Sequence, residues 1–209
     1  MKVKPLIFNT EMVKAILDGR KTVTRRPMNP QPEDSGLGYK WFPSNIVQSM
    51  VQIDNFKEDK EGYLKGIIAH VCPIACKGDL IYVRETFSHQ PCANAPELTV
   101  YKAGYPQPEL LSRYESVMSE NDIKWTPSIH MPRHSSRLTL KVTDVRIETI
   151  SELRKSPEQV AKEGFCSFPQ FKHVWRGIYG DCQPNDYVWV IEFEVIHKNV
   201  DKYLSEKSS

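Results

Sequence analysis

The alternation of apolar and polar side chains predicts four strands. Residues 138–143 alternate strictly, which is typical of a strand with one buried face. Residues 187–195 alternate in the same way and predict the final strand. A β-rich run at residues 80–85 follows a Gly-Asp turn. A further strand should begin near Thr22.

Apolar positions at helical spacing predict three short helices. Thr10 can cap the first, and Gly19 supplies its left-handed stop. The second begins at Ser156, which is followed by proline at the first helical position and glutamine at the third, and it ends at Gly164. The third covers residues 171–180.

Two long stretches interrupt these elements. Residues 30–77 show little periodicity and several turn signals, so we expect irregular structure there. Residues 88–127 contain five prolines, with one helix expected at residues 110–118. Strands with interspersed short helices and no βαβ rhythm predict an α+β fold, built on a mixed β-barrel.

Composition bounds the class of protein. The chain has 209 residues, 40% hydrophobic and 26% charged, which suits one or at most two globular domains and excludes disorder, collagen and coiled coil. No apolar run is long enough to span a bilayer, and the polar start lacks the core of a signal peptide. With five cysteines, an odd count, we expect reduced thiols and a cytoplasmic protein without a membrane partner.

Charge is unevenly distributed along the chain. The net charge is +2, but the first 30 residues hold seven Lys and Arg against two acidic residues, so they carry +5 and the rest −3. Residues 19–26 contribute four of these cations and two threonines. A plain interpretation is available, because cations suit a helix C-terminus and threonines suit a strand.

A chemical interpretation of the same segment centres on Lys21. Neighbouring arginines disfavour its charged form, which would make it a base for the hydroxyl of Thr24. Strand alternation places Lys21 and Thr24 on opposite faces, so this pairing requires Lys21 to lie in the preceding turn. Glu163 is the second unusual residue, because it lies at the unfavourable end of the helix dipole. Lys21 or an arginine of the basic segment would compensate it, and so would Lys162 or solvent.

Residues 128–137 bring two histidines and two arginines in front of the clearest strand. The arginines could bind phosphate, His130 or His134 could move protons, and Trp125 or Trp175 could stack on a base. The alternative is a solvated loop. His70, Cys72 and Cys76, with His89 and Cys92 further on, lack the duplicated spacing of a structural zinc site, so we expect no metal.

Four segments taken together resemble the ASCH domain family, which has a PUA-like β-barrel fold. They are LDGRKTVTRR at 17–26, GDLIYVRE at 78–85, VAKEG at 160–164 and VWVIEF at 188–193. The match covers roughly half of the chain. A further segment, WTPSIHMPR at 125–133, is similar to long ASCH members of tailed phages and prophages. The resemblance implies a single domain with a core of about 5–27, 78–88 and 130–200 and insertions of about 30–77 and 88–129.

The resemblance also implies a cleft for RNA or a modified nucleoside. One bacterial branch of the family comprises N4-acetylcytidine amidohydrolases, whose catalytic Lys, Thr and Glu fall on Lys21, Thr24 and Glu163. Thr24 would attack the acyl carbonyl, Lys21 would take its proton, and Glu163 would position Lys21 or protonate the departing amine. No cofactor is implied. The expected substrate-binding residues are Arg26, Arg84, Glu85, His130 and Arg133.

This chain is about twice as long as those small enzymes, so its insertions could cover the cleft or admit a larger, phosphate-bearing ligand. The alternatives are therefore a non-catalytic RNA or DNA reader, a ribonuclease, or an accessory protein of phage assembly.

Overall fold

The computed structural model describes residues 1–53, 63–89, 98–107 and 119–207. These residues form two compact units. The first unit comprises residues 1–2, 20–79 and 141–194. The second comprises residues 3–19, 80–140 and 195–209. Strands β9 (Thr139–Thr149) and β10 (Tyr187–Ile196) contribute residues to both.

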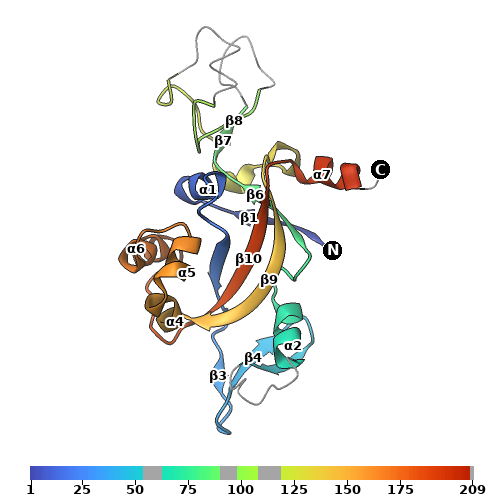
Figure 1. Ribbon diagram of the computed structural model, residues 1–209, viewed down its shortest axis with the longest axis vertical. Helices are drawn as coiled ribbons and strands as arrows, with labels where there is room; N and C mark the ends of the chain where they lie inside the picture. The colour runs from blue at the N-terminus through green and yellow to red at the C-terminus, as the bar shows by residue number, and fades with distance from the viewer. Residues whose placement is uncertain (54–62, 90–97, 108–118, 208–209) are drawn as a thin grey trace. The chain divides into compact units, whose positions relative to one another are not determined.

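Strand β2 (Val23–Pro27) pairs antiparallel with β10 in the first unit, so Thr24 lies opposite Ile191 and Arg26 opposite Trp189. Figure 1 shows β9 and β10 as two long curved ribbons. The predicted strands at 138–143 and 187–195 are confirmed. Four successive residues of β10 from Val188 are buried, so this strand has apolar contacts on both faces.

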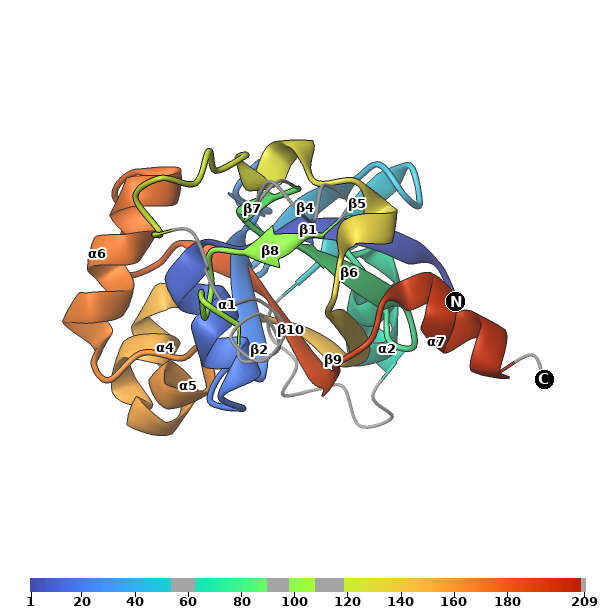
Figure 2. The ribbon, with the colours of Figure 1, turned by 90° about the horizontal axis from the view of Figure 1, so that it is seen from above.

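Three helices follow β9 in the first unit and lie next to one another in Figures 1 and 2. They are α4 (Ile150–Lys155), α5 (Pro157–Lys162) and α6 (Phe168–Tyr179). As predicted, Ser156 caps α5 by accepting a hydrogen bond from the backbone N–H of Gln159, and Gly164 follows with a φ of +88°. Helix α4 was not predicted, although Thr149 and Glu152 form a capping box at its start.

The expectation of irregular structure at 30–77 is wrong. This stretch holds a three-stranded antiparallel sheet of β3 (Glu33–Asp34), β4 (Lys40–Ser44) and β5 (Ser49–Gln52), and also α2 (Tyr63–Val71). Phe42 packs edge-on against Trp189, with 5.6 Å between ring centroids. Such short strands contain too few residues to show a clear alternation.

The second unit contains β1 (Val3–Ile7), which pairs in parallel with β6 (Leu80–Arg84), the strand predicted after the Gly-Asp turn. Its remaining elements are α1 (Thr10–Leu17), β7 (Phe87–Ser88), β8 (Val100–Tyr101), the 3-10 turns η2 (Ser128–His130) and η3 (Arg133–Ser135), and α7 (Val200–Lys207). Asn9, not Thr10, caps α1, because the Asn9 side chain accepts a hydrogen bond from Met12 N–H at 2.8 Å. The stop at Gly19, with a φ of +71°, agrees with the prediction.

The hydrogen-bonded strands follow the order β1-β6-β9-β10-β2, with parallel and antiparallel pairs in one sheet. The fold is thus a mixed α/β arrangement with a five-stranded sheet and short helices, and the strand pairs within the described ranges do not include one that closes this sheet into a barrel. The helix expected at 110–118 lies outside the described residues. In the part of the chain that the structure covers, no helix is long and apolar enough to cross a membrane.

Candidate functional site

Lys21 and Glu163 meet inside the first unit. Lys21 lies just before β2, and its backbone forms an antiparallel bridge with Glu163 at the end of α5. The Lys21 ammonium donates to Glu163 Oε2 at 2.6 Å and to the Glu163 backbone oxygen at 2.9 Å. Lys21 is 0% and Glu163 2% exposed. The predicted pairing of Glu163 with Lys21 is therefore present, between residues 142 positions apart.

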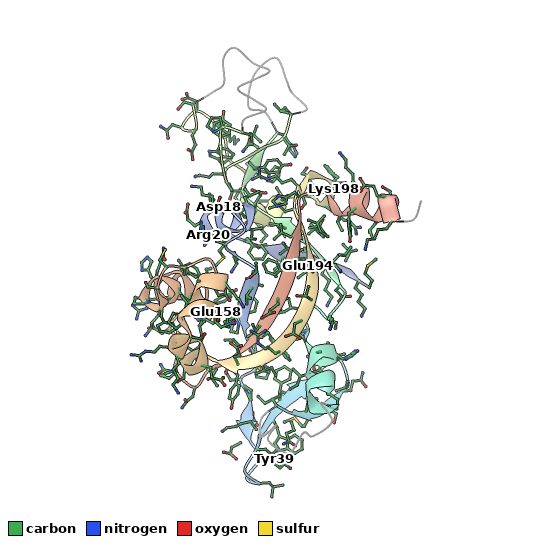
Figure 3. All side chains as sticks on the ribbon, in the orientation of Figure 1. Asp18, Arg20, Tyr39, Glu158, Glu194 and Lys198 are labelled. Atoms are coloured by element: carbon green, nitrogen blue, oxygen red, sulfur yellow. The ribbon has the colours of Figure 1, made fainter. Side chains whose placement is uncertain are left out.

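Glu163 lies where its charge is least favourable, at the C-cap of α5. Lys162, the alternative partner, pairs instead with Glu158 at 2.9 Å on the exposed face of the helix, where Figure 3 labels Glu158. Arg20, also labelled, is exposed and donates to the backbone oxygen of Gly164 at 3.2 Å. Several cations therefore lie near the end of α5, and among the described residues Lys21 and Arg25, both buried, contact the Glu163 carboxylate.

Arg25 is the second cation on that carboxylate. Its Nη1 donates to Glu163 Oε1 at 3.2 Å, and its side chain is fully buried. Its Nη2 donates to Glu148 Oε2 at 2.6 Å and to Gln159 Oε1 at 3.1 Å. The sequence interpretation offered an arginine of the basic segment as a partner of Glu163 without singling out Arg25, and it did not select Glu148 or Gln159. Alternation would have placed Arg25 on the face of Lys21, since the two are four residues apart on extended chain.

Arg146 extends this network of charged side chains. It donates to Glu148 Oε1 at 2.7 Å, to Glu192 Oε1 at 2.6 Å and to Gln159 Oε1 at 3.2 Å. Arg146 and Glu192 are about one-third exposed, so the network runs from a dry interior to the surface. Burial acts to raise the pKa of Glu148, but Arg25 and Arg146 outweigh burial and lower it.

Burial is the largest cause of a lowered pKa at Lys21. Glu163 opposes this effect, while Arg26 and Arg25 add to it. The prediction that neighbouring cations disfavour the ammonium therefore has the right direction, but loss of hydration contributes more than charge crowding. A lysine held in this way is a base that becomes neutral more readily than an exposed lysine.

Thr24 is buried on β2, at 2% exposure. Strand alternation places Thr24 with Arg26, whose guanidinium donates to the Tyr179 hydroxyl, and away from Lys21 and Arg25. Within the described residues, the hydrogen bonds of the Lys21 ammonium all go to Glu163. The structure thus joins Lys21 to Glu163 and does not hydrogen-bond Lys21 to Thr24.

The other expected binding residues belong to the second unit. Arg84 donates to the backbone oxygen of Ile129, and Arg133 pairs with Asp201 at 2.6 Å. Glu85 is 1% exposed, with both carboxylate oxygens on Arg137 at 2.9 Å. His130 is exposed in η2.

Trp175 and the cysteines were also candidates for binding, as a stacking ring and as metal ligands. Trp175 is buried in α6 against Phe171 and Tyr179, so it offers no free face for a base. The Cys76 thiol contacts the backbone oxygen of His70. Cys92 lies outside the described residues, and the described side chains include no group of three potential metal ligands.

Comparisons with family models, with curated proteins and with solved structures give no match for this chain.

Proposed function

We propose that this chain is a PUA-like ASCH domain whose Lys21 site hydrolyses the amide of an N4-acylated cytosine base. The contact between Lys21 and Glu163 carries the proposal, because it joins two of the three residues that the family motif selects. A buried ion pair is a weak source of stability, so a chemical role accounts better for its presence.

The proposed reaction uses neutral Lys21 as the general base. Lys21 Nζ takes the proton of the Thr24 hydroxyl as its oxygen bonds to the acyl carbon. The bond from that carbon to the N4 nitrogen breaks, and the departing amine receives the proton from the Lys21 ammonium, which Glu163 positions. Water then hydrolyses the acyl ester on Thr24 and releases the carboxylic acid. Because Lys21 donates to Glu163 in the structure, substrate binding must bring Thr24 to about 2.6 to 3.2 Å from Lys21 Nζ.

The test is incubation with N4-acetylcytidine, free and within RNA and DNA, with chromatography of the products. The proposal expects free cytidine and acetate. Lys21→Ala or Thr24→Ala should lower kcat at least about a hundredfold, the usual contribution of a general base or nucleophile. Lys162→Ala is the matched control, because Lys162 is adjacent to Glu163 in sequence but pairs with Glu158 on the surface. Absence of turnover on every acylated cytosine would contradict the proposal.

A second candidate is a non-catalytic reader of RNA or DNA, in which cations bind phosphates. It is favoured by the placement of Thr24, which is buried and does not receive a hydrogen bond from Lys21. A reader should bind with an affinity that falls steeply as salt is added. Binding should survive Thr24→Ala and weaken in Arg133→Ala, since the Arg133 side chain is 40% exposed. Binding that is absent or independent of salt, measured by fluorescence anisotropy, would exclude this candidate.

A further inference from the structure

Arg25 connects the Lys21 site to two other elements of the first unit. One guanidinium nitrogen reaches Glu163 at the end of α5, and the other reaches Glu148 on β9 and Gln159 within α5. These contacts hold the fully buried guanidinium in one orientation. A planar guanidinium can span two carboxylates in this way, whereas a lysine ammonium is a single point charge.

The Glu163 carboxylate is divided between two cations. Arg25 occupies Oε1 at 3.2 Å, and this leaves Oε2 for Lys21 at 2.6 Å. If Arg25 released Oε1, the carboxylate would be free to turn and offer both oxygens to Lys21. The Arg25 guanidinium thus determines whether one or both oxygens of the Glu163 carboxylate are available to the Lys21 ammonium.

Arg25 also solves a charge problem that arises when Lys21 is neutral. A buried carboxylate without a cation is costly, and loss of the Lys21 proton would create one if Lys21 were its only partner. Arg25 cannot lose its proton in a protein, so Glu163 stays paired throughout. The charged groups that act on Lys21 are Glu163, Arg25 and Arg26.

We propose that Arg25 is a positioning residue, which holds Glu163 so that Lys21 can lose and regain a proton in a buried site. The proposal rests on the proposed function only for its kinetic consequence. Its direct consequence is the ionisation of Lys21, which is measured without any substrate.

The experiment compares Arg25→Lys with Arg26→Lys. Both variants keep the positive charge, so a purely through-space effect of charge predicts no change in either. Positioning predicts that the ammonium introduced by Arg25→Lys pairs with Glu148, that Glu163 turns fully to Lys21, and that the pKa of Lys21 rises by about 0.5 to 1 unit. Arg26→Lys should leave it within about 0.2 unit of the wild type, because the Glu163 carboxylate contacts Lys21 and Arg25.

The measurement is an NMR pH titration of the full chain with 13C-labelled lysine, in which Lys21 is identified as the signal missing from Lys21→Met. A rise in Arg25→Lys alone supports the proposal. Equal shifts in the two variants, or no shift in either, overturn it. Failure of Arg25→Lys to fold while Arg26→Lys folds also overturns it, because Arg25 would then be a structural residue.

A kinetic measurement separates this inference from the proposed function. With N4-acetylcytidine as substrate, Arg25→Lys should move the acidic limb of the kcat profile to higher pH by the same amount. At neutral pH kcat should then fall about three- to tenfold, with KM unchanged within about twofold. If the wild type shows no turnover, the proposed function fails, and the titration still decides the role of Arg25.

Discussion

Glu163 has two cationic partners, whereas the Lys21 ammonium has hydrogen bonds to Glu163 alone within the described residues. This asymmetry determines what each substitution leaves behind. Removal of the carboxylate leaves the buried Lys21 ammonium without a carboxylate partner, although Arg25 keeps Glu148. Removal of the ammonium leaves Glu163 with Arg25. Breaking a buried pair is costly mainly because of the unpaired charge that remains.

We therefore predict that Glu163→Gln destabilises the protein by about 3 to 5 kcal/mol, whereas Lys21→Met costs less than about half of that. Urea unfolding followed by circular dichroism gives both free energies. Lys162→Met is the surface control and should stay within about 0.5 kcal/mol of the wild type. An equal or larger loss in Lys21→Met would show that Arg25 does not satisfy Glu163.

The sequence predicted Lys21 and Glu163 because each residue is unusual in its local setting. Lys21 lies among arginines, and Glu163 ends a helix at the negative pole of its dipole. Arg25 has no such local signature, since residues 20–26 offer several equivalent cations. Only the positions of β9 and α5 around β2 distinguish it from Arg20 and Arg26.

The sequence predicts helix α1 correctly but places its N-cap one residue too late. Asn9 and Thr10 are both good N-cap residues, and the sequence interpretation chose Thr10. The structure has Thr10 as the first helical residue and Asn9 as the cap.

Asn9→Ala should accordingly destabilise the protein by about 1 kcal/mol, because the Met12 N–H loses its acceptor. Thr10→Ala is the matched control and should change the free energy of unfolding by less than about 0.5 kcal/mol. Thermal and urea unfolding measure both variants. If Thr10→Ala destabilised the protein more than Asn9→Ala, Thr10 and not Asn9 would be the N-cap.

The elements that were predicted correctly have either strict alternation or clear end signals. Strand β9 and the cap of α5 are examples. The small sheet of β3, β4 and β5 was missed because its strands are two to five residues long. Turn residues dominate such a stretch, so its periodicity is weak. Its buried positions are identified by tertiary contacts such as that between Phe42 and Trp189.

For the whole molecule, part of the charge of the first 30 residues is buried and does not reach the surface. Lys21 and Arg25 are buried in ion pairs, and Lys14 pairs with Glu11 at 3.1 Å. Arg26 donates to Tyr179. Lys21 and Arg25 thus account for two of the seven cations behind the local excess of +5, and their charge lies in the buried site.

Stability at alkaline pH should reflect two groups with opposite effects. Burial raises the pKa of Tyr101 from 10.0 to about 12, while its hydroxyl donates to the Ser135 backbone oxygen at 2.9 Å. The folded state therefore keeps this proton longer than the unfolded state, and stability falls as pH rises from about 10 to about 12. Lys21, with its lowered pKa, acts in the opposite sense, because there the unfolded state binds the proton more tightly.

In the wild type, ionisation of Tyr101 should lower the free energy of unfolding by about 2 to 3 kcal/mol between these pH values, and Tyr101→Phe should abolish this decrease. Near neutral pH the variant should be less stable by about 1 kcal/mol, because it lacks the hydrogen bond. Urea unfolding between pH 8 and about pH 12, with absorbance at about 295 nm to follow tyrosine ionisation, measures both terms. If the free energy of unfolding of Tyr101→Phe fell with alkaline pH as steeply as that of the wild type, other groups would be responsible for the decrease.

The sequence by itself determined the long strands, the helix ends marked by Ser156 and Gly164, and the two residues whose local settings are electrostatically unfavourable. Periodicity, caps and dipoles act over a few residues, so the local chain encodes them. Only the tertiary structure decided that Arg25 shares Glu163 with Lys21 and that Glu85 is held by Arg137. These pairings join residues far apart in the chain, and burial decides their chemistry.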